Sequence, residues 1–291
     1  MPRPQLAIVV NARSSRAKET IAPALAVLLE EGFDLRVRLP ESPEEMRDLL
    51  RDTASDFDAV AVAGGDGTIN AALPALIELG CPVGILPTGT ANDFARTVGI
   101  PPDPVAAAHV IAGGHRRRVD VGRVNGHHFL NAASIGLAVR VAEHQQDGRK
   151  QEWGVLSYAL TTLEALTEAD RFHAVIDCEG TRHEVNAYQI AVGNGIFYGG
   201  GMRLAPDAEI DDGFLDVYAI ESDSIADLVA LAPAVRAGTH GDSPDVTTLR
   251  CQRLRIETDR PAPINTDGEV TTGTPAEFEV VNLGLEVIVP Q

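Results

Sequence analysis

The segment AGGDGTIN, residues 63–70, carries the strongest structural signal of this chain, because it places glycines and one carboxylate between an apolar run and a helical pattern. The preceding run DAVAVA, residues 58–63, is short and apolar, as in a strand buried inside a parallel sheet. After the glycines, apolar residues recur at helical spacing from Ile69 to Leu79, and Gly80 is placed to end the helix. The segment therefore predicts a tight turn that connects a strand to a helix.

A glycine-rich turn of this kind is suited to holding phosphate. Glycines let the backbone adopt positive φ and approach a ligand closely, and the N–H groups of the first helical turn attract anions. Asp66 would repel phosphate unless a hard cation such as Mg²⁺, which takes oxygen ligands, lies between them. The alternative is that Gly-Asp-Gly only makes a tight turn, and the segment alone leaves both interpretations open.

Two further loops follow predicted strands in the same way. The loop NARSS, residues 11–15, comes after a strand at residues 5–10, and the loop PTGTANDFA, residues 87–95, comes after a strand at residues 82–86. Ligands of open α/β sheets bind beyond the carboxyl ends of the strands. We therefore expect the three loops to converge on one site.

The first part of the chain alternates strands with helices, which predicts a parallel sheet covered on both faces. Further elements are expected as a helix at 20–31, a strand at 34–39 and a helix at 43–52. The helix at 43–52 has the strongest start signal, with Ser42 as N-cap, Pro43 at the first position and Glu45 three residues after the cap. This half is expected to be a nucleotide-binding α/β domain over residues 1–120.

The texture changes after residue 114, where short strand-like segments separated by turns dominate. They predict a second domain over residues 121–291, a β-sandwich or flattened barrel interrupted by two helices at 155–168 and 224–237. The sequence leaves open whether the last strand belongs to this second domain or returns to the first. The expected strands lie at residues 118–124, 127–131, 173–178, 185–192, 214–220, 254–258, 277–281 and 285–289.

Composition narrows the class of protein. The formal net charge of the 291 residues is −18, which argues against a nucleic-acid partner, and no apolar run approaches the roughly 18 residues of a membrane span. Lys18 and Lys150 both lie far from the glycine turn, so a Walker-type P-loop is excluded. Three cysteines, at positions 81, 178 and 251, lack any C-x-x-C spacing, which predicts neither a disulfide nor a zinc site and favours a reducing cytosol.

Several motifs together resemble the diacylglycerol kinase catalytic family, in particular its soluble bacterial lipid kinases. The resemblance spans essentially the whole chain and implies a two-domain ATP-dependent kinase with a phosphofructokinase-like or NAD kinase-like first domain, a C-terminal β-sandwich and an active site between them. The motifs that carry it are GGDGTIN (64–70), GTANDFA (89–95), FLN (129–131), GGGM (199–202), DDGFLDV (211–217) and DGE (267–269).

The resemblance also implies roles for individual residues. Glu269 would be the general base that takes the proton of a lipid hydroxyl, and Asp267 would orient it or bridge to Mg²⁺ together with Asp66. A structural Mg²⁺ would be held by the Asp212 side chain and by backbone carbonyls of Glu209 and Phe214. The residues expected to bind ATP are Asn11, Ala12, Arg13, Ser14, Ser15, Gly64, Gly65, Asp66, Gly67, Thr68, Ile69, Asn70 and Thr90.

Without the resemblance, residues 266–269 read as an ordinary hairpin turn and residues 207–212 as a solvated acidic turn. The chain also departs from the family pattern at Ala12, Ser15 and Pro40, which puts part of the ATP contact in question. The alternatives to a lipid kinase are therefore an NAD kinase or other small-molecule kinase, and a lipid- or nucleotide-binding regulator without catalysis. A cytoplasmic protein is expected, with the inner membrane face as the place where it meets its lipid, and the sequence leaves the oligomeric state open, a homodimer included.

Overall fold

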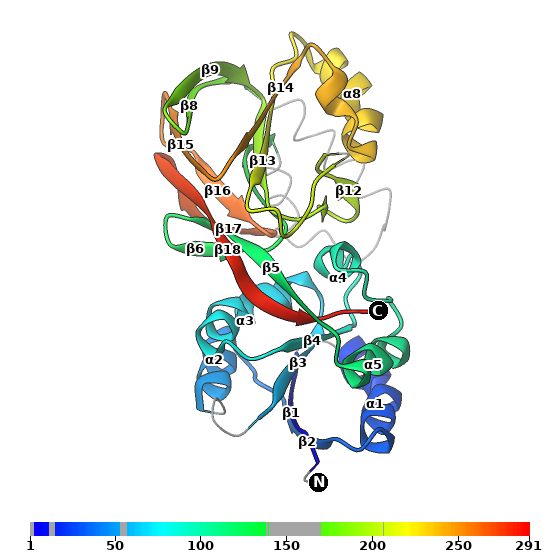
Figure 1. Cartoon of the computed structure of the whole chain (residues 1–291). Coiled ribbons are helices and arrows are strands. Elements are labelled where there is room, and N and C mark those ends of the chain that lie inside the picture. Colours follow the sequence, from blue (N-terminus) through cyan, green and yellow to red (C-terminus); the bar gives the residue numbers. More distant parts are fainter. Residues whose placement is uncertain (1–2, 12–14, 53–56, 138, 140–169, 206) are drawn as a thin grey trace.

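The computed structural model describes residues 3–11, 15–52, 57–137, 139, 170–205 and 207–291. The first half of the chain contains a helix-flanked sheet, and the second half contains two antiparallel layers. Figure 1 shows the second half above the first. The expected combination of a parallel α/β domain and a C-terminal β-sandwich is confirmed. Within the described part of the chain, no helix has the length and apolar character needed to cross a membrane.

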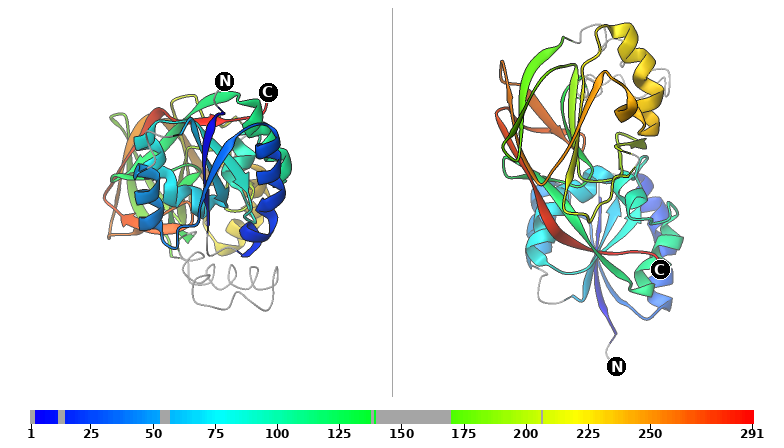
Figure 2. Two further views of the ribbon diagram at one scale, coloured as in Figure 1. Left: turned by 90° about the horizontal axis from the view of Figure 1, so that it is seen from below. Right: turned by 45° about the horizontal axis from the view of Figure 1, so that its top comes forward.

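The first half is built on parallel strands in the order β2-β1-β3-β4. Helices α1 and α5 cover one face of this sheet and helices α2 and α3 cover the other (Figures 1 and 2). The elements are β1 (Gln5–Val10), α1 (Ser15–Glu30), β2 (Asp34–Arg38), α2 (Pro43–Asp52), β3 (Ala59–Gly64), α3 (Asp66–Leu79), β4 (Val83–Pro87), the short α4 (Asp93–Thr97) and α5 (Pro104–Gly113).

The local signals of the sequence account for these elements. Strand β3 is buried at all six positions, as its uninterrupted apolar pattern predicts, and fully burying one valine- or leucine-sized side chain contributes roughly 1.5–3 kcal/mol. At the start of α2, the hydroxyl of Ser42 accepts the N–H of Glu45 at 3.1 Å, so the predicted cap is confirmed. Gly80 ends α3 in the left-handed conformation, with φ of 62°.

Two long strands connect the halves. Strand β5 (Arg116–Val124) and strand β18 (Ala276–Ile288) pair antiparallel, and β18 lies parallel to β4 through Val287 and Val83. The last strand of the chain thus joins the sheet of the first half, and Figure 2 shows it running from the sandwich into the α/β layer. The segments expected at 277–281 and 285–289 are one strand with an irregularity between Val281 and Leu285.

The second half is a sandwich of two sheets around an apolar core. One sheet continues from β18 through β15 (Arg253–Thr258) and β8 (Phe172–Cys178) to β9 (Thr181–Ala187), and β6 (His127–Phe129) pairs with β5. The other has the order β14 (Val246–Cys251), β13 (Leu215–Ile220), β10 (Gln189–Gly193), β7 (Ala132–Gly136), β16 (Pro263–Thr266) and β17 (Glu269–Gly273). Helix α8 (Ile225–Ala237), the 3-10 turn His240–Asp242 and the hairpin of β11 (Phe197–Tyr198) and β12 (Met202–Arg203) complete it.

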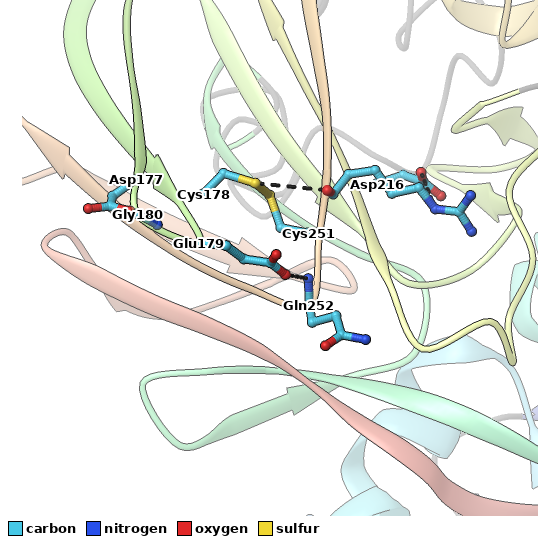
Figure 3. Close-up of a disulfide and its surroundings, with 8 residues drawn as sticks. Asp177, Cys178, Glu179, Gly180, Asp216, Cys251 and Gln252 are labelled. Atoms are coloured by element: carbon cyan, nitrogen blue, oxygen red, sulfur yellow. Dashed lines mark hydrogen bonds and ion pairs between the residues drawn. A yellow bond between two sulfur atoms is a disulfide. The ribbon is translucent and has the colours of Figure 1, made fainter.

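The prediction that the cysteines form no disulfide is wrong. Cys178 and Cys251 are bonded, with Cα atoms 5.9 Å apart, although 73 positions separate them. Cys178 ends β8 in one sheet and Cys251 ends β14 in the other, so the bond joins the two sheets (Figure 3). The spacing gave no sign of this pair, because the contact arises where the chain crosses at Gln252 from β14 into β15, the neighbour of β8.

Some elements differ from the expectation. Helix α5 was not predicted, because its sequence is apolar on nearly every side and shows little helical contrast. The segment expected as one strand at 185–192 is the end of β9 followed by β10. The helix predicted at 155–168 lies outside the described residues.

Candidate active site

The three loops that follow β1, β3 and β4 meet at the carboxyl edge of the parallel sheet. The N–H of Asn11 donates to the carbonyl of Ala63 at 3.2 Å, and the Asn11 amide donates to the hydroxyl of Thr68 at 3.0 Å. The N–H of Thr88 donates to the carbonyl of Gly64 at 3.0 Å. The convergence expected from the strand order is therefore present in the structure.

Two glycines allow the second and third loops to approach closely. A Cβ atom on Gly89 would lie 2.5 Å from the Cα of Gly65, and one on Gly65 would lie 3.0 Å from the Cα of Gly89. Gly65 also precedes the first residue of α3, whose start is not capped by any described side chain. Backbone N–H groups at such a helix start favour an anion.

The residues expected to bind ATP differ in how exposed they are. Ile69 is 1% exposed and packs in the core, so only its backbone belongs to the turn, whereas Thr90 is exposed. Ser15 begins α1, but its side chain is not described. Ala12, Arg13 and Ser14 lie outside the described residues, so their predicted contacts stay predictions.

Thr88 has a feature that sequence reasoning missed. Its side chain is 5% exposed, and its hydroxyl has no hydrogen-bond partner among the described residues. A buried hydroxyl without a partner is costly unless a ligand or water satisfies it. Its position directly after β4, two residues before Thr90, was the available signal.

Asp66 and Asp93 connect the glycine turn to the second half. Asp66 accepts the N–H of Phe94 at 3.0 Å, and the buried Asp93 accepts the N–H of Gly200 at 2.7 Å. Burial raises the pKa of Asp93, and the negative charge of Asp66 adds to that increase. The motif GTANDFA contains Asp93, but the sequence alone does not predict its contact with Gly200 of the second half.

Asp267 is the anchor of the hairpin between β16 and β17. Its carboxylate accepts the N–H groups of Leu130 at 2.7 Å and of Asn131 and Ala132 at 3.0 Å each. Burial raises the pKa of Asp267 to about 6, the three N–H donors oppose this, and the charge of Asp66 adds to it. Asp66 and Asp267 are therefore within electrostatic range of each other, although they come from different halves.

Glu269 follows this anchor by two residues and is the first residue of β17. Asp267 and Gly268 both have positive φ, 49° and 98°, which is the geometry of a two-residue hairpin turn. Glu269 is exposed, and its carboxylate makes no hydrogen bond or ion pair with any described residue. The hairpin reading and the functional reading are thus compatible, because the turn presents a free carboxylate beside a fixed one.

A buried polar network lies behind the hairpin. The Asn194 amide donates to the carbonyls of Asp120 and Leu130, at 3.0 and 2.9 Å. Asp120 is 1% exposed, and its carboxylate accepts the N–H groups of Gly213 at 2.7 Å and Leu283 at 2.6 Å. The network links the segment held by Asp267 to the acidic loop before β13.

The acidic loop contains the residues for which the resemblance implies a structural Mg²⁺. One oxygen of Asp212 accepts the N–H of Phe214 at 2.9 Å, and the other contacts the guanidinium of Arg250. Glu209 is exposed. In the described part of the chain, no group of three or more His, Cys, Asp or Glu side chains is arranged to hold a metal ion. Both carboxylate oxygens of Asp212 thus have a partner within the protein, and the predicted Mg²⁺ site with the backbone carbonyls of Glu209 and Phe214 stays a prediction.

Family models match both halves of the chain. Residues 5–124 match the diacylglycerol kinase catalytic domain, and residues 131–289 match the YegS C-terminal NAD kinase beta sandwich-like domain. The second match alone covers more than half of the chain.

Individual proteins agree with these matches. The chain is 28% identical over 292 residues to the "Diacylglycerol kinase" of Bacillus subtilis (strain 168), covering 98% of this chain and 96% of that protein. It is 31% identical over 293 residues to the "Probable lipid kinase YegS-like" of Pseudomonas aeruginosa (strain UCBPP-PA14), covering 100% and 96%. The crystal structure of a diacylglycerol kinase from Bacillus anthracis str. Sterne superposes with a TM-score of 0.78 at 26% identity, covering 100% of this chain and 98% of that one. The chain therefore belongs to the diacylglycerol kinase and YegS-like family of lipid kinases, as its motifs predict.

Proposed function

We propose that this protein is an ATP-dependent kinase that phosphorylates the hydroxyl of a diacylglycerol-like lipid, with Glu269 as general base. The observation that supports this most is the hairpin at 266–269, which presents the free carboxylate of Glu269 while Asp267 is fixed on the backbone of residues 130–132. The negative charge of Asp66 raises the pKa of Asp267, so the hairpin and the glycine turn are near enough for their charges to interact. Membership of a lipid kinase family supports the same reaction.

The strand-end loops fit a nucleotide triphosphate tail. Gly65 and Gly89 let the backbones of two loops approach each other at the uncapped start of α3, and the buried hydroxyl of Thr88 is available to donate. With no lysine near the turn, backbone N–H groups and a divalent cation are the expected partners of the phosphate charge. We extend the proposal to the ATP-binding residues given above, with Thr88 added.

Three carboxylates have different roles in the proposed reaction. When bound, Mg-ATP supplies the phosphoryl group and the cation that offsets phosphate charge. Glu269 accepts the proton of the lipid hydroxyl as its oxygen forms the new bond to phosphorus. Asp267 keeps the turn before Glu269 in place, and Asp66, with one oxygen bonded to Phe94, has its second oxygen for Mg²⁺.

The acceptor is proposed to be a lipid that the protein meets at a membrane surface or extracts from it. Residues 153–160, which the resemblance places beside the lipid cleft, lie outside the described residues. The cytoplasmic location stays a prediction. The disulfide between Cys178 and Cys251 means that the cysteines no longer support a reducing compartment.

Radiolabelled ATP incubated with the protein, Mg²⁺ and a mixed lipid extract tests the proposal. We expect label in a lipid, and we expect Glu269→Gln to reduce the rate by at least about 100-fold while the Kd of ATP stays within a factor of a few. Glu184→Gln on strand β9, another exposed strand glutamate, is the matched control.

The alternatives give different results in the same assay. Label that appears only in soluble acceptors such as NAD would favour a small-molecule kinase. No ATP consumption with any lipid would favour a non-catalytic regulator. A Glu269→Gln variant that phosphorylates lipid at the normal rate would disprove the assignment of the base.

A further inference from the structure

Arg250 packs against the acidic loop before β13, and the proposed reaction assigns no role to its contacts there. It lies on β14, next to Cys251 of the disulfide. Its guanidinium contacts the carboxylate of Asp212 and lies 3.8 Å from that of Asp216. Its Cζ atom also lies 4.8 Å from the centre of the Phe214 ring. One cation thus lies against Asp212 of the loop, Asp216 of strand β13 and the ring of Phe214.

These contacts restrain Arg250 on several sides. The guanidinium is planar, so it can bond a carboxylate with its edge while its face covers an aromatic ring. The backbone from which it projects is held by the bond between Cys251 and Cys178 and by the hydrogen bond of 2.9 Å from Gln252 N–H to Glu179 (Figure 3). The side chain is therefore fixed from both its base and its end.

A second arginine, Arg117, forms an ion pair with the neighbouring carboxylate of Asp211. Asp211 accepts two hydrogen bonds from the guanidinium of Arg117, at 2.7 and 2.6 Å. The backbone of the loop is held separately, by the hydrogen bond of 2.7 Å from Gly213 N–H to Asp120. Asp211 and Asp212 are thus each paired with an arginine of the protein itself.

We propose that the guanidinium of Arg250 takes the place of a divalent cation in the acidic loop, so that the fold of this loop requires no bound metal. A divalent ion and a guanidinium on one carboxylate would repel each other strongly in a partly buried site. Arg250 contacts one oxygen of Asp212 and the N–H of Phe214 donates to the other, so a metal at Asp212 would compete with one of these partners. The family resemblance leads one to expect a structural Mg²⁺ here, and this chain departs from that expectation. The inference does not depend on the proposed reaction.

Thermal unfolding of the nucleotide-free protein tests the inference. After treatment with EDTA, millimolar CaCl₂ or MgCl₂ should shift the Tm of the wild-type protein by less than about 1 °C. Arg250→Gln should lower the Tm in EDTA, and Ca²⁺ should then raise it by at least about 3 °C, because the freed carboxylates can bind the ion. This rescue should be absent in the double variant Arg250→Gln with Asp212→Asn.

Arg253→Gln is the matched control, because Arg253 has an 81% exposed side chain and only a distant ion pair to Glu279 at 4.0 Å. Its Tm should follow the wild type with and without metal. A wild-type Tm that rises with Ca²⁺ or Mg²⁺, and does so only when Asp212 is intact, would overturn the inference. So would an Arg250→Gln variant that is destabilised but not rescued by either ion. If Arg250→Gln fails to fold, wild type against Asp212→Asn still decides, since equal insensitivity supports the inference and an Asp212-dependent rise refutes it.

Discussion

Gly65 and Gly89 lie so close together that a Cβ atom on Gly89 would come within 2.5 Å of the Cα atom of Gly65. One glycine belongs to the turn after β3 and the other to the loop after β4, and these strands are neighbours in the sheet. The same added atom would also lie 2.7 Å from the side-chain oxygen of Asn92. The two loops therefore share a space that a side chain would fill.

Gly89→Ala should force these loops apart and weaken ATP binding. We expect the KM for ATP to rise by at least about 10-fold and the free energy of unfolding to fall by roughly 1–3 kcal/mol, the usual cost of overpacking. Steady-state kinetics and thermal unfolding measure the two effects. Gly113→Ala at the end of α5 is the control, since its Cβ would meet an ordinary contact at 3.9 Å. An unchanged KM for Gly89→Ala would refute the phosphate role of this turn.

Asp267→Asn should reduce kcat more than it reduces ATP affinity. An asparagine retains only one acceptor oxygen for the three N–H groups of residues 130–132, so the turn before Glu269 loosens at a cost of roughly 1–3 kcal/mol. Single-turnover kinetics and nucleotide titration separate the two quantities. Asp259→Asn, in an exposed turn, should change neither. A variant of Asp267 with normal kcat would show that the hairpin needs no anchor.

Loss of the disulfide should destabilise the sandwich. Cys178→Ser removes a link that closes 73 positions of chain between the two sheets, and such links contribute typically about 2–4 kcal/mol. We expect a lower Tm for the variant, and a reducing agent should lower the Tm of the wild type but not that of the variant. Equal Tm values for wild type and variant would mean that the bond adds no stability.

Acidification should destabilise the region around His240. This residue is 2% exposed, its ring lies edge-on to Tyr218 at 4.4 Å, and burial lowers the pKa of His240. The folded state therefore binds the proton less readily than the unfolded state, so the contribution of His240 is present above its ordinary pKa of about 6.5 and is lost as pH falls below that value. Asp267, with its pKa raised to about 6, acts in the opposite direction, so the effect of His240 is read from the difference between variants: acidification from pH 7 to pH 5 should lower the Tm of the wild type relative to that of His240→Gln. His109→Gln, with a 58% exposed side chain, should behave as the wild type does.

The glycine turn was predictable because all of its signals are local. The buried strand β3, the uncapped start of α3 and the left-handed Gly80 each depend on neighbours within a few positions. The start of α2 was predictable for the same reason, since Ser42 and Glu45 interact within one turn. Helix α5 was missed although Asp103, Pro104 and Gly114 mark its ends. Its sequence is almost entirely apolar, so polar and apolar residues do not alternate with the period of a helix.

Contacts between distant segments were not predictable in the same way. The roles of Asp267 on residues 130–132 and of Asp93 on Gly200 depend on more than a hundred intervening positions. The contact of Arg250 with Asp212 and the bond between Cys178 and Cys251 depend on how β14 enters the sandwich. Neither pair has a characteristic spacing, so a search for local patterns passes over them.

The amino-acid order alone determined the alternation of strands and helices, the glycine-rich turn and the family, because hydrophobic period, capping and turn chemistry act over a few residues. Only the tertiary structure decided which carboxylates are free and which are bound. Whether Glu269 is open while Asp267, Asp93 and Asp212 are engaged depends on donors that the fold brings from other strands. The physical reason is that hydrogen bonds and ion pairs form between neighbours in space, whereas local sequence signals describe neighbours along the chain.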